Sequence, residues 1–430
     1  MPEQDNLLVT LAAPQTPSII KIIGVGGGGC NAVGHMYKTG MQDVRFLVCN
    51  SDRKSLEDSP VPDRLQIGPG LGCGGDPKKG RELAEESIER IREALDKDTK
   101  MVFITTGMGG GTGTGASPVI AREAKKKGIL TVGIVTTPFL FECKPRIDKA
   151  LDGVEAIAKE VDALLVINNQ RLCDIYSNLS VIDAFAKADD TLTIAAGSIV
   201  EIISMHGRVG LDFQDVCTVL RDGGVSIMST GYGEGEQRVT KAISNALHSP
   251  LLNRNDVYDA SKIILCLTFS DEEQHTLIME EMNEINEFME GFQEDIETKW
   301  GMATDRSLGK KVKVTILASG YGLFGKSQRR NSERREEEDF SEKGIQRAHM
   351  RDNIYGKRRF TKIRPPRPRV HIYNIDDLEN ERIIALVDNT PTRTRSRAIQ
   401  TEIQALSDHT ESAPSPQTAE PDSNIISFDL

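Results

Sequence analysis

Five glycines and two threonines occur within the seven residues from Gly109 to Gly115, and no other stretch points so clearly to chemistry. Glycine lacks a Cβ atom, so the main chain can come close to a bound anion, and threonine hydroxyls can donate hydrogen bonds to phosphate oxygens. A packed backbone has little structural use for so many glycines in one short run. The pattern therefore favours a phosphate-binding loop over an ordinary flexible turn.

A second glycine-rich run extends from Gly24 to Gly29. It is not a Walker A loop, because no Gly-Lys-Ser or Gly-Lys-Thr follows it. Each run comes after an apolar strand pattern and before a helical pattern, and the helix after the first run is expected to start near Ala32. Because the carboxyl ends of parallel strands meet at one edge of a sheet, we expect the two loops to converge there and to hold a polyphosphate from two sides.

The wider pattern predicts a doubly wound parallel-sheet α/β domain, a long central helix over 181–205 and a smaller α+β domain. The second domain is expected to contain a strand at 262–270, an amphipathic helix with an apolar stripe, and a final strand at 311–319. The stripe consists of Ile278, Met282, Ile285, Met289 and Phe292 and is interpreted as facing the core. In the first domain the expected strands are 19–23, 44–50, 101–107, 130–137 and 163–168, and the expected helices are 31–39, 79–96, 113–127 and 145–160.

Composition and charge indicate the redox state of the cysteines, the absence of membrane spans and the character of the tail. The 430 residues carry a net charge of −11, and seven scattered cysteines without metal-site spacing favour reduced thiols over a disulfide framework. No signal peptide and no apolar run near 18 residues is evident, so we expect a chain that is neither exported nor membrane-spanning. Residues 326–370 hold 15 basic and 7 acidic side chains, whereas 371–430 hold 4 and 11, which is typical of a solvated, disordered tail.

Two further segments complete a family pattern. Pro138 to Glu142 and Leu211 to Asp215, together with the two glycine-rich runs, resemble the tubulin/FtsZ superfamily in order and spacing over about residues 18–322. The resemblance implies a cytoplasmic GTPase that polymerises head to tail into filaments forming the division ring at the septum, with Mg²⁺ bridging the phosphates of GTP. It divides the chain into a flexible N-terminal segment (1–17), a GTP-binding α/β domain (18–180), a central helix and connecting loop (181–210), an α+β second domain (211–322), and a disordered charged linker with a C-terminal docking segment (323–430).

The resemblance also implies a set of GTP-binding residues. Glu142 matches a residue that holds the ribose hydroxyls, and Arg146 matches a basic residue nearby; a surface ion pair is the alternative for these two. Phe185 could stack on a purine, and Asp189, one helical turn later, could accept from guanine N1–H and N2–H₂ together, which adenine cannot offer. The phosphate-contacting residues implied are Gly27, Gly28, Gly29, Cys30, Asn31, Gly110, Gly111, Thr112, Gly113 and Thr114, with the loops 50–52 and 70–75 expected close to the ribose, metal and γ-phosphate.

The catalytic residues implied are Asp212 and Asp215, which in the family complete the nucleotide site of the next subunit and polarise the attacking water. Their structural alternative is a helix cap, and both roles can hold together. Where the family commonly has Asn, two residues before the first Asp, this chain has Gly210. That departure predicts slower turnover and keeps open a GTP-binding, filament-forming structural paralogue with little hydrolysis. A nucleotide-dependent oxidoreductase is a more distant alternative, disfavoured by Asp189 and the 109–115 loop.

The tail predicts partners. The chain ends in acidic and apolar residues, Asp422 to Leu430, without the Pro and basic residues usual in the family's terminal peptide. By resemblance we expect division adaptor and regulator proteins to bind the tail, and contact with the membrane to be indirect. The basic linker is interpreted as a solvated spacer, with contact to anionic lipid or nucleic acid as the alternative, and no nucleic acid is among the expected partners.

Overall fold

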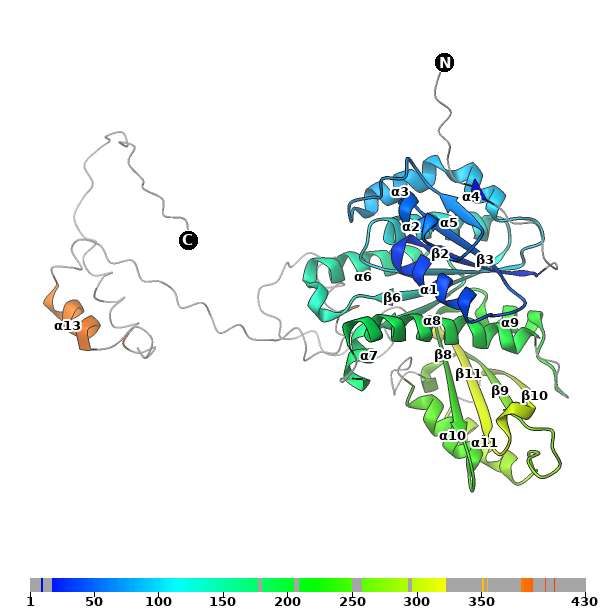
Figure 1. Cartoon of the computed structure of the whole chain (residues 1–430). Coiled ribbons are helices and arrows are strands. Elements are labelled where there is room, and N and C mark those ends of the chain that lie inside the picture. Colours follow the sequence, from blue (N-terminus) through cyan, green and yellow to red (C-terminus); the bar gives the residue numbers. More distant parts are fainter. Residues whose placement is uncertain are drawn as a thin grey trace, which may run out of the picture. The chain divides into compact units, whose positions relative to one another are not determined.

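The computed structural model describes residues 9–10, 18–176, 180–204, 209–249, 257–292, 296–321, 350–351, 354, 380–389, 399 and 406. By its contacts the chain divides into two compact units, residues 1–359 and 360–430. All helices and strands discussed below, except α13, belong to the first unit, which is shown in blue to yellow in Figure 1.

One eleven-stranded sheet runs through the first unit, in the order β1-β4-β3-β2-β5-β6-β7-β8-β11-β9-β10. The run from β4 to β8 is parallel, whereas β11 pairs antiparallel with both β8 and β9, and β9 and β10 are parallel to each other. The strands are β1 (Val9–Thr10), β2 (Ile20–Val25), β3 (Arg45–Asn50), β4 (Arg64–Gln66), β5 (Met101–Gly107), β6 (Leu130–Thr137), β7 (Ala163–Asn168), β8 (Gly224–Gly233), β9 (Lys262–Phe269), β10 (Glu297–Thr304) and β11 (Val312–Tyr321).

Helices cover both faces of the parallel part. Buried side chains of α1, α8 and α9 form one core against one face, and those of α4, α5 and α6 form a second core against the other. A third core joins α10 and α11 to β9 and β11. The helices are α1 (Gly26–Lys38), α2 (Arg53–Glu57), α3 (Pro77–Glu86), α4 (Ile88–Ala94), α5 (Thr112–Lys126), α6 (Lys144–Ala158), α7 (Asn169–Ile175), α8 (Val181–Ser204), α9 (Phe213–Leu220), α10 (Arg238–Leu247) and α11 (Glu281–Met289), with 3₁₀ turns η1 (Leu140–Glu142), η2 (Val257–Asp259) and η3 (Arg306–Leu308).

The expected doubly wound architecture is confirmed, and the differences are local. The helix expected near Ala32 begins at Gly26, because most of the first glycine-rich run forms the first turn of α1. The expected helix 79–96 is two helices, α3 and α4. The short strands β1 and β4 were not predicted, nor were the longer strands β8 and β10 of the second domain. In the α11 stripe, Ile285 and Phe292 are buried as expected, but Ile278 precedes the helix and is exposed. The boundary expected between 210 and 211 stays a prediction, since one sheet runs through both halves.

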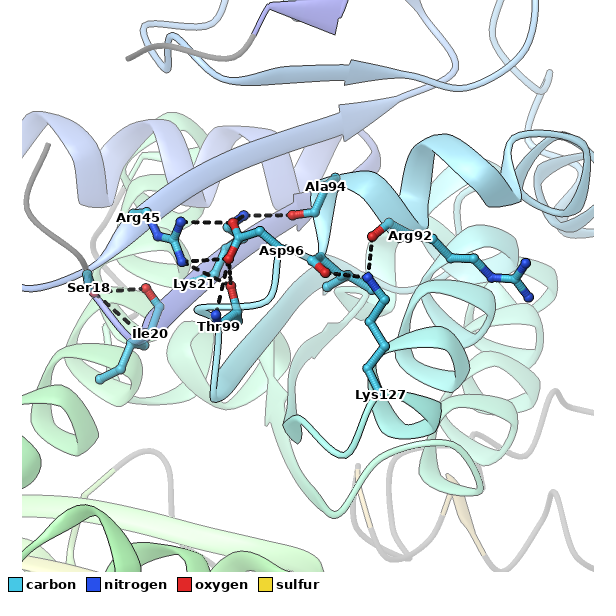
Figure 2. A network of polar contacts seen from close by, with 10 residues as sticks. Ser18, Ile20, Lys21, Arg45, Arg92, Ala94, Asp96, Thr99 and Lys127 are labelled. Carbon is cyan, nitrogen blue, oxygen red and sulfur yellow. Dashed lines mark hydrogen bonds and ion pairs between the residues drawn. The ribbon is translucent and has the colours of Figure 1, made fainter. Parts of the chain in front are cut away.

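A polar network joins the amino-terminal ends of β2, β3 and β5, at the edge opposite the glycine-rich loops (Figure 2). The ammonium of Lys21 is buried and lies 2.6 Å from Asp96 Oδ2, Arg45 donates to both Asp96 oxygens, and Thr99 donates to Oδ1. Burial opposes ionisation of Asp96, but these hydrogen bonds outweigh it and hold the pKa of its carboxyl well below the usual range. The network therefore ties the starts of three strands together at that edge.

Few residues after 321 are described. Arg351 is buried and lies 3.7 Å from Asp148 of α6, and the carbonyl of Ile354 accepts from Asn168 at the end of β7. In the second unit the apolar stretch 383–387 lies within a helix, α13 (Glu381–Asn389), which the sequence patterns did not predict. The sequence has two further short apolar runs in this charged region, 370–373 and 425–428, and both lie outside the described residues. No helix in the described part of the chain is both long and apolar enough to cross a membrane.

Candidate nucleotide site

The two glycine-rich loops meet at the carboxyl edge of the parallel strands, as predicted. Gly26, which opens α1, has a φ of +72°, and a Cβ added to it would lie 2.7 Å from the amide nitrogen of Gly113 in α5. A Cβ on Gly28 would lie 3.4 Å from Gly107, the last residue of β5. The first turns of α1 and α5 therefore lie against each other, with β2 and β5 side by side beneath them.

Several of these positions require glycine because neighbouring atoms leave no space for a Cβ, which the sequence alone did not indicate. A Cβ on Gly29 would meet the carbonyl oxygen of Thr105 at 2.2 Å, one on Gly113 the Thr106 hydroxyl at 2.3 Å, and one on Gly115 the Pro77 carbonyl at 2.0 Å. The expectation that packing has little use for the glycines of the 109–115 loop is therefore wrong for Gly113 and Gly115. Added Cβ atoms on Gly27 and Gly110 would meet no atom within 4 Å. These two glycines therefore border open space, which is where a ligand could approach the backbone.

Both helix amino termini at this edge present main-chain amides without a capping side chain. The residue before α1 is Val25 and the residue before α5 is Gly111, and neither makes a side-chain cap bond. The neighbouring helices α2 and α3, in contrast, are capped by aspartates, Asp52 and Asp76. Amides at an uncapped helix start carry partial positive charge and suit an anion such as phosphate.

The side chains of Ser51, Cys73 and Thr112 form a small cluster beneath the carboxyl edge of the sheet, where the two glycine-rich loops lie. The hydroxyls of Ser51 and Thr112 lie 2.6 Å apart, and the Cys73 sulfur lies 3.2 Å from the first and 3.4 Å from the second. All three side chains are buried. The sequence placed loops 50–52 and 70–75 near the nucleotide but gave no sign of this contact, because a single Ser or Cys has no periodicity or spacing to detect.

The other phosphate-loop residues divide into exposed and inward-facing groups. Gly27, Gly28 and Asn31 are exposed at the start of α1, whereas Gly29 and Cys30 are buried. The Cys30 sulfur lies 3.6 Å from the carbonyl oxygens of Gly24 and Cys49, and burial raises the pKa of its thiol far above the usual value. Cys30 can therefore contribute its main chain and not its thiolate. The Thr114 hydroxyl is also turned inward and accepts from the amide of Gly109.

Glu142 and Arg146 lie beside the phosphate loop as an ion pair. Arg146 Nε is 3.1 Å from Glu142 Oε2, and Glu142 Oε1 accepts from the amide of Phe139. Arg146 packs directly on the second glycine-rich loop, since a Cβ on Gly109 would lie 2.9 Å from its Cγ. The ion pair considered as an alternative therefore forms, and it forms next to the loop that would hold the phosphates.

Phe185 and Asp189 lie on the amino-terminal half of α8. Phe185 is half-exposed, and its ring packs edge-on against Phe139, with ring centroids 5.0 Å apart. Burial raises the pKa of the Asp189 carboxyl to about 6, opposed by His35 of α1. His35 in turn pairs with Asp190 at 2.8 Å. A partly buried carboxylate without an ion-pair partner is a strong acceptor for N–H donors, which fits recognition of guanine.

Asn169, the first residue of α7, was not singled out from the sequence. It is buried at the same carboxyl edge, after β7, and within the described part of the chain its side-chain oxygen has no hydrogen-bond partner. A buried, unsatisfied amide oxygen is costly unless a ligand or water supplies a donor. Asn169 therefore joins the candidate nucleotide contacts.

Asp212 and Asp215 lie away from these groups, beyond the other end of α8. The helix rises about 22 Å between Asp189 and Ser204, at 1.5 Å per residue. Asp212 caps α9 and accepts from the amide of Asp215 at 2.9 Å, while Asp215 accepts from the amide of Asp212 at 3.1 Å. The cap expected as the structural alternative is therefore present. Asp212 is exposed and Asp215 is partly exposed.

The comparisons with known proteins agree with this architecture. Family models match at residues 19–177 (Tubulin/FtsZ family, GTPase domain), 224–322 (FtsZ family, C-terminal domain) and 366–410 (FtsZ, C-terminal). The cell division protein FtsZ of Porphyromonas gingivalis is 46% identical, over 91% of this chain and 88% of that protein. FtsZ of Pseudomonas putida is 42% identical, over 72% and 78% respectively. A solved structure of an empty FtsZ dimer from M. jannaschii aligns with a TM-score of 0.64 at 35% identity, covering 70% of this chain and 88% of that one.

The fold and the loops define a nucleotide-binding α/β protein that carries a second domain on the same sheet. The comparisons make the class specific: the chain belongs to the tubulin/FtsZ family, and to FtsZ within it, with its GTPase domain at residues 19–177. The sequence resemblance is thereby confirmed.

Proposed function

We propose that this filament-forming GTPase of cell division hydrolyses GTP only at the contact between successive subunits, where Asp212 and Asp215 of one subunit face the GTP of the next. The observation that carries the proposal is the separation along α8. The nucleotide edge lies toward one end of this helix, and both aspartates follow its other end, about 22 Å of helix away from Asp189. The two parts of the site meet only if a second copy of the chain supplies one of them.

A contact between unlike surfaces of the same chain propagates without closing, so it builds a filament. The M. jannaschii FtsZ structure that aligns with this chain is a dimer, which supports assembly between copies. In each subunit the phosphates would lie against the amino termini of α1 and α5, the ribose near Glu142 and Arg146, and the base between Phe185 and Asp189. The residues proposed for contact also include Gly27, Gly28, Gly29, Cys30, Asn31, Gly110, Gly111, Thr112, Gly113 and Thr114.

Mg²⁺ fits this site as an ion held chiefly by phosphate oxygens. Among the described residues no group of three or more His, Cys, Asp or Glu side chains lies close enough to hold a metal by itself. Mg²⁺ bound to a nucleotide needs no such cage, since phosphates and water fill most of its shell. The Ser51 and Thr112 hydroxyls, 2.6 Å apart beside the start of α5, are oxygen atoms that could contribute to its coordination. When bound, the ion would neutralise charge on the phosphates, while the helix-terminal amides orient them.

The proposal is tested by measuring GTP hydrolysis per subunit against protein concentration, with sedimentation of polymer in parallel. We expect the rate to switch on above a critical concentration, together with pelleting. Asp212→Asn and Asp215→Asn should bind GTP as monomers with wild-type affinity, assemble, and hydrolyse GTP about 100-fold more slowly. A rate per subunit that stays constant down to high dilution would show a self-contained monomer site and refute the proposal.

We further propose that the ring forms at the division septum in the cytoplasm and that adaptor and regulator proteins bind the tail. The support is family membership and the match of residues 366–410 to a C-terminal FtsZ model. Deletion of 366–430 is expected to leave filament assembly by the purified chain intact and to abolish its recruitment to the septum. Normal septal localisation of the truncated chain would contradict this.

A further inference from the structure

The loop that carries the proposed catalytic aspartates is held by one strand, β10, at three places. β10 is the last strand of the sheet, paired with β9 on one side only. On its other side, the amide of Met302 donates to the carbonyl of Val209 at 2.9 Å and forms an isolated bridge. A Cβ on Gly301 would lie 2.7 Å from the Leu211 side chain, so Leu211 packs on bare backbone there. The third contact is made by Lys299.

Lys299 binds Asp215 directly. Its ammonium lies 3.0 Å from Asp215 Oδ1, while Asp215 Oδ2 accepts from the amide of Asp212. Both oxygens of the carboxylate therefore have a donor, and its orientation is fixed. Lys299 and Gly301 are two positions apart on one strand, so they share a face, and that face lies toward the loop.

The contact also changes the charge that the loop presents. Asp212 and Asp215 would bring two negative charges to the triphosphate of the neighbouring subunit, which repels them. Lys299 cancels one of the two. The nearest other charges on these strands, Glu297 and Lys262, lie 3.8 Å apart and compensate each other.

We propose that Lys299 is a positioning residue for hydrolysis, which acts through Asp215 to orient its carboxylate and to reduce the repulsion between the loop and the neighbouring subunit's phosphates. This inference rests on the proposed function above. It does not follow from the sequence, in which no strand was predicted around Lys299 and nothing links this lysine to Asp215.

The test compares Lys299→Met, Lys299→Arg and Lys299→Glu with the wild type in polymer-coupled GTP hydrolysis. Lys299→Met should lower kcat about 10-fold or more and raise the critical concentration, with unchanged GTP affinity of the monomer. Lys299→Arg should restore most of the rate, and Lys299→Glu should be the slowest. The control is Lys311→Met, which removes an exposed lysine from the turn before β11 and should behave as wild type.

A pH profile separates positioning from a merely structural role. The hydrogen bond from the Asp212 amide, and then Lys299, holds the pKa of Asp215 below its usual value. Without Lys299 the carboxyl protonates at a higher pH, so the acid limb of kcat should move upward in Lys299→Met and return in Lys299→Arg. The charged groups that face Asp215 are Asp212 on its own loop and Lys299, with Glu297 beside the latter.

Mixing experiments test whether the effect acts across the interface. Lys299→Met subunits keep an intact nucleotide pocket, and Asp189→Ala subunits keep an intact loop. At a GTP concentration that Asp189→Ala does not bind, the mixture should hydrolyse faster than the sum of the two alone.

The outcomes distinguish the two proposals. If Asp215→Asn keeps the wild-type rate, the proposed function is wrong, and Lys299 loses its role with it. If Asp215→Asn is inactive but Lys299→Met matches the wild type in rate, critical concentration and pH profile, only the inference about Lys299 is overturned.

Discussion

Asp189 gives the sharpest test of base recognition, because its protonation should control GTP affinity between pH 5 and 7. The pKa of its carboxyl is raised to about 6 by burial. Only the ionised carboxylate can accept from guanine N1–H and N2–H₂ together, so protonation removes the contact. If only the ionised form binds, affinity falls about 2-fold at pH 6 and about 11-fold at pH 5, relative to pH 8.

The assay is GTP binding to dilute monomer by calorimetry or a fluorescent analogue, repeated from pH 5 to 8. Protonation of the triphosphate contributes in the same range, so the informative quantity is the ratio of wild-type affinity to that of Asp189→Asn at each pH. The phosphate contribution cancels in this ratio. We expect the ratio to fall about 10-fold from pH 8 to pH 5, following a single ionisation.

His35 is the second group to control. His35 pairs with Asp190 at 2.8 Å and lowers the pKa of the Asp189 carboxyl. In a His35→Gln background the fall should persist and begin at a higher pH, since a nearby cation no longer favours the carboxylate. A ratio that stays constant from pH 5 to 8 would refute the assignment of Asp189 to the base.

Three further predictions concern stability and turnover. Asp96→Asn leaves the buried Lys21 without its anion and should cost about 2 to 3 kcal/mol in urea unfolding, against no change for the exposed Asp98→Asn. The difference should begin to shrink as pH falls below about 4, where the unfolded chain binds the proton, and should vanish only below the lowered pKa of the native Asp96 carboxyl. Gly26→Ala places a Cβ 2.7 Å from Gly113 at positive φ and should abolish GTP binding measured by calorimetry, whereas Gly40→Ala, also at positive φ but in open space, should not. Gly210→Asn, for which the loop has room, should raise turnover per subunit; an unchanged rate would show that the missing amide does not limit hydrolysis.

The long periodic elements could be predicted from the sequence because each carries its own signal. The α8 helix, the strands β2, β5, β6 and β7, and the convergence of the two glycine-rich loops all follow from apolar periodicity and from the rule that parallel strands end at one edge. The start of α1 was misplaced, because glycine has poor helix propensity and only contacts with β5 and α5 make Gly26 to Gly29 helical.

The contacts that could not be predicted are those between single residues distant in sequence. Ser51, Cys73 and Thr112 meet through three different loops, and Lys299 reaches Asp215 across 84 positions. No local pattern encodes such a pairing. Helix α13 was missed for a different reason, since its short apolar stretch lies in a charged segment whose composition is typical of disorder.

The short pairing between β7 and β8 has a consequence for how the subunit responds to force. Parallel strands β5, β6 and β7 are joined by six or seven register pairs each, but β7 and β8 share only two, Ala163 with Gly224 and Leu164 with Val225. A sheet deforms first where the fewest hydrogen bonds resist it. Under a force along a filament, the strands from β4 to β7 and those from β8 to β10 would each deform little. Most of the deformation would occur between β7 and β8, where α8 packs across the junction. We therefore expect elastic bending of the subunit to concentrate where β7 meets β8.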